Sequence, residues 1–246
     1  MHNSLQVKDV RKHFVRHGKD LPVLAGISFQ AEPGQVVAIL GRSGSGKTTL
    51  LNIISELEST DSGTINFEGE ISYTPQKDLL LPWRTVKSNV LLPFEIRHDL
   101  DKEHENRVDV LLKEFDLDDF KNVYPNELSG GMRQKTSLIR SLAQDATLYI
   151  FDEALSAIDF DSRLKIARQI RSYVLTKNKI GLFITHNIEE AISIADKVVV
   201  LSSRPAKVIY EANIKIPEDD RTPVSIRKNL EFQNQFETIW KFMSQS

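Results

Sequence analysis

The sequence predicts an α/β fold: a largely parallel sheet covered by helices, with an antiparallel β edge and an inserted α-helical subdomain. Three observations predict it. Short β-branched apolar runs, typical of buried parallel strands, alternate with helical patterns. One such run leads directly through a glycine-rich loop into a helix. Strand patterns are missing from about residue 77 to residue 146 and then return, which indicates a helical insertion.

The first part of the chain predicts an antiparallel edge followed by a strand-loop-helix unit. Residues 5–14 and 23–31 have strand patterns around a turn-like stretch at 17–20. Residues 35–40 (Gln-Val-Val-Ala-Ile-Leu) form a buried strand pattern that leads to a helix from about 47 to 57. A further strand pair is expected at 64–67 and 71–74.

The rest of the chain predicts helices first and then the βαβ alternation of a parallel sheet. Helical spacing is found near 108–115 and at 129–143, and strand patterns at 148–151, 179–185, 197–201 and 207–210. We therefore expect one domain over 1–246. Its α/β core comprises 1–76 and 146–223, its helical subdomain 77–145 and its C-terminal helix 224–246.

Composition excludes several classes of protein. With 246 residues, 40% hydrophobic and 27% charged, the chain is long enough to bury a sizeable core. The net charge is -2 and Lys and Arg are scattered, so no nucleic-acid partner is predicted. The absence of cysteine excludes disulfides, thiolate metal sites and a cysteine nucleophile. No run approaches the roughly 18 apolar residues of a membrane span, so any membrane role is expected to come through a partner.

Residues 41–48 read Gly-Arg-Ser-Gly-Ser-Gly-Lys-Thr and predict a phosphate-binding loop. Its glycines let successive backbone N–H groups turn toward a phosphate. Lys47 supplies a cation for the β and γ phosphates, and the hydroxyl of Thr48 is a Mg²⁺ ligand. A chance glycine-rich turn is the alternative, and the strand before and helix after the loop disfavour it. The expected ATP-binding residues here are Gly41, Arg42, Ser43, Gly44, Ser45, Gly46, Lys47, Thr48 and Thr49.

The apolar strand at 148–151 ends in Asp152 and Glu153, and α/β proteins place ligands at such strand ends. We expect Asp152 to hold Mg²⁺ through water and Glu153 to polarise the attacking water. Taken alone, the pair could equally be an acidic turn after a strand.

A second glycine-rich segment, Leu-Ser-Gly-Gly-Met-Arg-Gln at 128–134, opens a helix with Ser129 as N-cap, followed by Gly130 and Gly131. The exposed N–H groups and positive end of such a helix suit an anion, although a flexible helix cap is also a common feature. A second anion site far in sequence from Lys47 needs an explanation.

These motifs, taken in order, resemble the nucleotide-binding subunit of an ATP-binding-cassette (ABC) transporter over nearly the whole chain. The resemblance implies a RecA-like P-loop NTPase core in which 41–48 is the Walker A loop. In that family the Leu-Ser-Gly-Gly-x-x-Gln signature of one subunit closes over the γ-phosphate of ATP held by the other subunit's loop. Two identical chains, head to tail, would therefore enclose two ATP molecules, with Ser129, Gly130, Gly131 and Gln134 of each completing the partner's site.

The resemblance also assigns roles to single residues. Phe14 would stack on adenine, although an aromatic residue on a strand is more often part of the core. Gln76 would sense Mg²⁺ and the γ-phosphate, and Asp159 would couple the two sites. His186 would bind the γ-phosphate, and its place after a strand suits a ligand site. Glu153, His186 and Gln76 are thus the expected catalytic set, and Thr48, Gln76 and Asp152 the expected metal set.

Three residues depart from the family's usual pattern. Ala154 stands where proline commonly follows the catalytic glutamate, Arg42 where proline is frequent in the loop, and Asn187 where aspartate often follows the histidine. None removes a phosphate, metal or water contact, so we expect activity to survive.

The segment after Gln76, Leu-Leu-Leu-Pro-Trp-Arg-Thr-Val at 79–86, is either plain core or a groove for a partner's helix. Its Leu-Leu-Pro-Trp and the later Leu-Ser-Ser-Arg-Pro at 201–205 resemble the nitrate, sulfonate and taurine importers. This implies uptake of a small solute through a separate permease, and indirectly a solute-binding protein. The chain would lie peripherally on the cytoplasmic face of the membrane.

Two other functions remain as alternatives. One is a soluble cassette ATPase with a mechanical or regulatory role, although such proteins usually carry two fused cassettes or long coiled-coil arms. The other is a small-molecule kinase, which would leave 128–134 unexplained.

Overall fold

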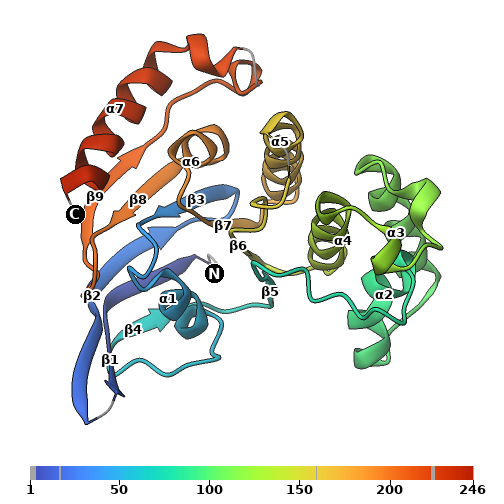
Figure 1. The fold of residues 1–246 in the computed structure, drawn as a ribbon, viewed down its shortest axis with the longest axis horizontal. Helices are drawn as coiled ribbons and strands as arrows, with labels where there is room; N and C mark the ends of the chain where they lie inside the picture. The colour runs from blue at the N-terminus through green and yellow to red at the C-terminus, as the bar shows by residue number, and fades with distance from the viewer. Residues whose placement is uncertain (1–3, 17, 159, 223–224, 246) are drawn as a thin grey trace.

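The centre of the molecule is a six-stranded sheet with strand order β5-β6-β7-β3-β8-β9 (Figure 1). The computed structural model describes residues 4–16, 18–158, 160–222 and 225–245. Neighbouring strands are parallel from β5 to β8, and β9 is antiparallel to β8. The predicted α/β fold is confirmed. The strands are β3 (Gln35–Leu40), β5 (Ile71–Thr74), β6 (Leu148–Asp152), β7 (Ile180–Thr185), β8 (Lys197–Leu201) and β9 (Val208–Asn213).

The predicted antiparallel edge is a separate sheet of order β2-β1-β4, formed by β1 (Leu5–Arg16), β2 (Lys19–Ala31) and β4 (Ser62–Asn66). The expected pairing of 64–67 with 71–74 is wrong, because β4 pairs with β1 whereas β5 pairs in parallel with β6. Gly69 explains the difference. It has φ 143°, and a Cβ there would lie 2.7 Å from Thr147 Oγ1, so the chain passes tightly by the start of β6 and enters the larger sheet.

Side-chain alternation along β3 divides the core into two clusters. Val37 and Ile39 pack in the cluster that holds helix α1 (Lys47–Ile54) and the antiparallel sheet. Val36, Ala38 and Leu40 pack on the opposite face with the remaining helices. Strands buried on both faces are apolar throughout, as the sequence predicts. The helices beside this sheet are α5 (Phe160–Thr176), α6 (Ile188–Ile194) and α7 (Leu230–Gln245).

Residues 75–147, all of them described, contain no strand. Their helices, α2 (Val86–Arg97), α3 (Lys102–Glu114) and α4 (Gly130–Leu142), form a group beyond the β5 edge (Figure 1). Ser141 of α4 ties this group to the sheet, because its Oγ accepts a hydrogen bond from Thr74 Oγ1 at 2.7 Å. The division of the chain at residues 76, 145 and 223 stays a prediction.

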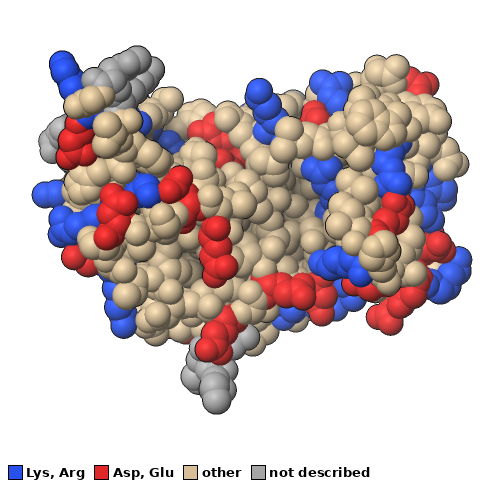
Figure 2. Space-filling model, turned by 90° about the horizontal axis from the view of Figure 1, so that it is seen from below, with Lys and Arg blue, Asp and Glu red and all other residues tan. Residues whose placement is uncertain are grey.

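The C-terminal helix begins later than predicted. Residues 226–228 form a 3₁₀ turn, and α7 starts at Leu230 because Asn229 Oδ1 accepts the N–H groups of Glu231 and Phe232. Among the helices that the structure describes, none is long and apolar enough to cross a membrane. On the face shown in Figure 2, Lys and Arg are interspersed with Asp and Glu.

Candidate active site

The loop at 41–48 connects the end of β3 to the start of α1, as predicted. Gly44 and Gly46 have φ 79° and 106°, which side chains rarely adopt. A Cβ on Gly46 would lie 3.0 Å from Val23 Cγ1 and 3.1 Å from Leu24 Cδ2. Strand β2 therefore presses directly on the loop, and only glycine fits there.

Lys47 is held inside the loop that it begins. It is 7% exposed, and its Nζ donates to the carbonyl oxygens of Gly41 at 2.8 Å and Arg42 at 3.0 Å. Burial lowers the pKa of Lys47, and the charges of Glu153 and Asp152 oppose that shift. Both carboxylates are therefore close enough to act on the loop.

Ser45 adds a second polar group to the loop. It is 1% exposed, and its Oγ has no hydrogen-bond partner among the residues that the structure describes. A buried hydroxyl next to a lysine and a row of glycine amides fits the oxygens of a phosphate group. This observation agrees with the residue types that the sequence indicates for the loop.

Asp152 ends β6 and is almost buried, at 7% exposure. Its Oδ2 accepts a hydrogen bond of 3.0 Å from the hydroxyl of Tyr73 on the neighbouring strand β5. Burial raises the pKa of Asp152, and the Tyr73 hydrogen bond partly offsets this. Tyr73 is a site residue that the sequence motifs do not indicate; its position on a strand, three residues before Gln76, is the available signal.

Glu153 is fixed between two other predicted residues. Gln76 Nε2 donates to its Oε2 at 3.0 Å, and His186 Nδ1 lies 3.2 Å from its Oε1. Its backbone has φ 46°, and its N–H donates to Ile184 O at 2.9 Å, which turns the residue away from β6. Three segments distant in sequence thus meet at this carboxylate.

The segment that carries His186 is fixed by its neighbours. Thr185 Oγ1 accepts the N–H of Asn187 at 3.0 Å and donates to Glu190 Oε2 at 2.5 Å, while Asn187 caps α6 by accepting the N–H of Glu190. Glu190 is 6% exposed, and burial raises the pKa of its carboxyl. Glu190 is not evident from the sequence, because an acidic residue in the first turn of a helix is usually solvent-exposed.

The signature segment lies apart from the phosphate loop. Ser129 caps α4 by accepting the N–H of Met132 at 3.2 Å, as predicted. Gln134 is 2% exposed, and its Nε2 has no partner in the described part of the chain. Because α4 packs in the cluster on the opposite face of the sheet from α1, one chain does not bring the two glycine-rich segments together (Figure 1).

Two further residues, Phe14 and Asp159, were predicted to belong to the site. Phe14 on β1 is 36% exposed rather than part of the core, and Lys12 Nζ lies 5.3 Å from its ring centroid. An exposed ring suits stacking on a base. Asp159 falls outside the described residues.

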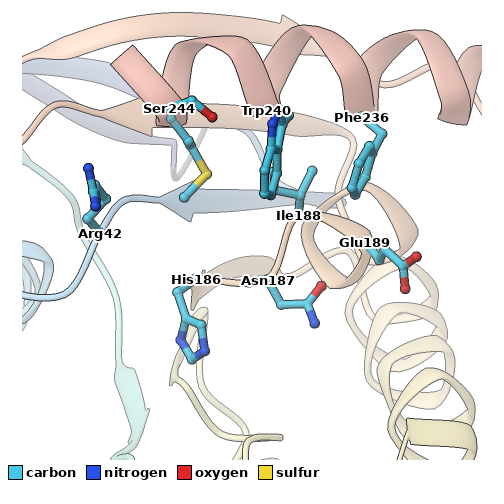
Figure 3. Close-up of a pocket in the computed structure, with 9 residues that line it drawn as sticks. Arg42, His186, Asn187, Ile188, Glu189, Phe236, Trp240 and Ser244 are labelled. Carbon is cyan, nitrogen blue, oxygen red and sulfur yellow. The ribbon is translucent and has the colours of Figure 1, made fainter. Parts of the chain in front are cut away.

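A cavity of about 680 Å³ opens beside the site (Figure 3). Arg42 and His186 lie on one side of it, and Phe236 and Trp240 of α7 lie on the other. No sequence motif indicates that the C-terminal helix reaches the nucleotide loop.

Comparison with known proteins identifies this arrangement. Residues 24–156 match the family model described as ABC transporter. The chain belongs to the ABC transporter family. The ATP-binding and ATPase activity that its motifs predict is confirmed, as is the resemblance from which the site residues were assigned.

Three of the most similar curated relatives are ATP-binding proteins of import systems. The formylaminopyrimidine import protein ThiZ of Halalkalibacterium halodurans is 36% identical over 86% of this chain and 85% of its own length. The nitrate import protein NrtD of Synechocystis sp. is 34% identical over 89% and 85%. The aliphatic sulfonates import protein SsuB of Bacillus cereus is 32% identical over 87% and 88%.

Two solved structures of the bacterial ABC transporter cassette MJ0796 share the fold. Its dimeric structure matches with a TM-score of 0.78 at 25% identity, over 87% of this chain and all of that one. A dimeric post-hydrolysis state bound to ADP and Pi matches with a TM-score of 0.77 at the same identity and coverage.

Proposed function

We propose that this chain is the ATP-hydrolysing subunit of an ABC importer for a small solute. The observation that carries the proposal is the position of Glu153, held by Gln76 and His186 at the end of β6. The curated relatives, whose names describe import of formylaminopyrimidine, nitrate and aliphatic sulfonates, support the direction of transport.

Hydrolysis needs a positioned water and compensation of charge on the transferred phosphoryl group. Lys47 and the glycine amides hold the β and γ phosphates, and Glu153 orients the attacking water and accepts its proton. His186, whose side chain is 61% exposed and whose Nδ1 lies 3.2 Å from Glu153 Oε1, would bind the γ-phosphate. Phe14 supports the adenine.

Thr48, Gln76 and Asp152 suit Mg²⁺. No group of three His, Cys, Asp or Glu residues forms a metal cage in the described ranges. A single buried carboxylate with a hydroxyl and an amide oxygen is the donor set of a Mg²⁺ that keeps its waters and binds mainly to nucleotide phosphates. When bound, the ion neutralises charge on the β and γ phosphates.

The separation of the two glycine-rich segments supports a head-to-tail homodimer. Ser129, Gly130 and Gly131 open α4 at the surface of the helical group, and the loop of the same chain is distant. A second copy supplies these groups and Gln134 to the γ-phosphate, and Asp159 couples the two sites. The MJ0796 cassette, which shares this fold, is dimeric.

The segment after Gln76 is the contact for a membrane permease. Trp83 is 71% exposed and Leu79 60%, so these two are surface residues and not the plain core that was one reading of the sequence. Arg140 of α4 holds the segment by donating to the carbonyl oxygens of Leu79 at 3.0 Å and Asp78 at 2.8 Å. Docking there would move Gln76 and α4 together.

The chain acts at the cytoplasmic face of the membrane as a peripheral subunit. The solute, of the nitrate, sulfonate or taurine type, contacts the permease and a solute-binding protein and never this chain. The alternative of a soluble regulatory ATPase is not favoured, because the similar relatives serve import.

Glu153→Gln tests the catalytic assignment. The variant should bind ATP with unchanged affinity and form a stable dimer, while its turnover falls about 100-fold to 1,000-fold. Glu153 contributes through its charge, which glutamine lacks at the same size. Near-normal phosphate release would contradict the role of Glu153. Glu68→Gln, at an exposed position between β4 and β5, serves as the matched control.

Copurification tests the transport assignment. Tagged chain, extracted in mild detergent from its own cells, should carry an integral membrane protein with it. Trp83→Ala should reduce this yield, because it removes the most exposed ring of the proposed contact. Recovery of soluble partners alone would favour the regulatory alternative.

A further inference from the structure

The cavity of about 680 Å³ joins the nucleotide loop to the C-terminal helix. Arg42 of the loop and His186 lie on one side, and Phe236 and Trp240 of α7 on the other (Figure 3). Met243 of α7 also lines the cavity. Because the loop and the helix line the same cavity, a protein that approaches the loop across this surface also contacts the aromatic rings of α7.

The rings form an exposed apolar shelf. Phe236 and Trp240 are one helical turn apart and stack with centroids 6.3 Å apart and planes at 12°. Trp240 is nevertheless 58% exposed. Single exposed apolar residues are common on protein surfaces, but a stacked tryptophan beside a half-built catalytic site is the residue type that dominates interface energies.

The shelf is firmly held in position. Phe232, one turn before Phe236 on the same stripe of α7, is buried and stacks on the Phe236 ring with centroids 6.3 Å apart. Ile239 of α7 is also buried, and the ring of Phe242 stacks on Tyr210 of β9 with centroids 4.6 Å apart. Arg221, 3% exposed, joins the segment before α7 to the end of α6 by donating to the carbonyl oxygens of Ile192, Ser193 and Ala195. Since α6 begins directly after His186, the shelf keeps a fixed position relative to the site and is preorganised for binding.

We infer that the α7 shelf is part of the contact between two copies of this chain, and that Trp240 becomes covered when ATP closes the dimer. The inference rests on the proposed function, in which a second copy approaches the phosphate loop. The edge of the shelf carries both signs of charge, with Arg42 and Lys241 against Glu237. Glu189, also at this edge, is paired within its own chain with Arg227 at 3.3 Å. A patch with both signs can complement its own copy across a two-fold axis, which favours a second copy as the occupant.

The two tryptophans of the chain provide the test, because only Trp83 and Trp240 are present. In the Glu153→Gln protein, W83F leaves Trp240 as the sole reporter, and W240F leaves Trp83. Acrylamide quenching is measured with MgATP over a range of protein concentrations, and sedimentation velocity reports dimer formation in the same samples. We expect Trp240 to lose most of its quenching as dimers form, whereas Trp83, with no permease present, stays quenchable. At protein concentrations low enough that the chain binds ATP as a monomer, any change in quenching comes from ATP alone. These samples therefore separate the effect of ATP on quenching from the effect of dimer formation.

Dimer affinity provides the second measurement. Trp240→Ala should raise the dissociation constant of the ATP-bound dimer about tenfold or more, and Trp83→Ala should leave it unchanged. Trp240→Phe keeps an aromatic ring on α7 and should fall between the two, so a folding defect of the alanine variant does not decide the outcome.

The results separate the inference from the proposed function. If dimers form but Trp240 stays quenchable and W240A dimerises normally, the shelf is not in the contact, and the proposed function stands. Protection of Trp240 only after permease is added would also overturn the inference. If no variant with an intact loop dimerises with ATP, both the proposed function and the inference fail.

Discussion

The phosphate loop and the signature segment are both glycine-rich turns that begin a helix, yet the structure builds them differently. The loop is packed from within its own chain: Gly46 presses on β2, and Lys47 is 7% exposed. The signature segment is open. A Cβ on Gly130 would meet nothing nearer than 3.8 Å, and one on Gly131 nothing nearer than 3.7 Å.

This difference in packing indicates a different role for each turn. A loop whose lysine and amides are preorganised by its own strand can hold a phosphate without help. A helix start that keeps space around its glycines can admit a group brought by another molecule, since the first N–H groups of a helix have no partner inside the helix. The same sequence feature therefore forms a phosphate-binding loop at 41–48. At 128–134 it forms a surface that can complete the site of another molecule.

Lys47→Ala should have the largest effect, because it removes the only lysine of the loop. We expect ATP affinity to fall about 100-fold, in line with losing hydrogen bonds to charged phosphate oxygens. Isothermal titration calorimetry measures this, with Lys19→Ala, at the start of β2 and exposed, as control. Binding within about twofold of the unchanged protein would contradict a preorganised loop.

Gly46→Ala should come next, because alanine there requires φ near 106° and contacts Val23 and Leu24 at 3.0–3.1 Å. The free energy of unfolding should fall by about 1–3 kcal/mol. Denaturant titration measures it. A variant as stable as the parent would show that β2 does not confine the loop.

Gly131→Ala is the matched change in the open turn, and its stability effect should be small. Alanine within α4 should leave the free energy of unfolding unchanged or raise it by up to about 1 kcal/mol. ATP affinity should stay the same, while ATPase turnover falls about tenfold because a methyl group enters the space meant for the γ-phosphate. Turnover equal to the parent's would mean that the space around Gly131 is not used.

Tyr73→Phe should have the smallest effect. The variant loses only the hydroxyl that donates to Asp152, so the carboxylate that faces Mg²⁺ is less well oriented. The Mg²⁺ concentration for half-maximal ATPase should rise about threefold, and calorimetry of MgATP binding should shift in the same direction. Tyr210→Phe, which removes a hydroxyl far along the sheet on β9, is the control.

Much of the fold and of the loop follows from local pattern. The apolar runs at 35–40 and 148–151 and the glycine spacing at 41–46 each depend on a few consecutive residues, so periodicity and turn chemistry suffice. The meeting of Gln76, Glu153 and His186 was expected mainly through family resemblance, and the positions of the three at or just after strand ends explain it physically.

Other features depend on distant contacts that no local pattern encodes. Tyr73 reaches Asp152 only because β5 lies beside β6, and the sequence analysis had paired β5 with β4 instead. The return of α7 to the cavity beside His186 likewise follows from packing on α6 and β9, which the periodicity of α7 alone cannot place.

Mixing two inactive variants tests most directly whether each ATP site uses the loop of one chain and the signature of another. Lys47→Ala destroys the loop and Ser129→Arg fills the open turn, so each alone should hydrolyse almost no ATP. In a mixed dimer, one site combines both defects, and the other joins an intact loop to an intact signature. The account predicts ATPase activity in the mixture well above the sum of the two variants alone. Activity no greater than that sum, in samples where a tag on one variant captures the untagged other variant with it, would contradict it.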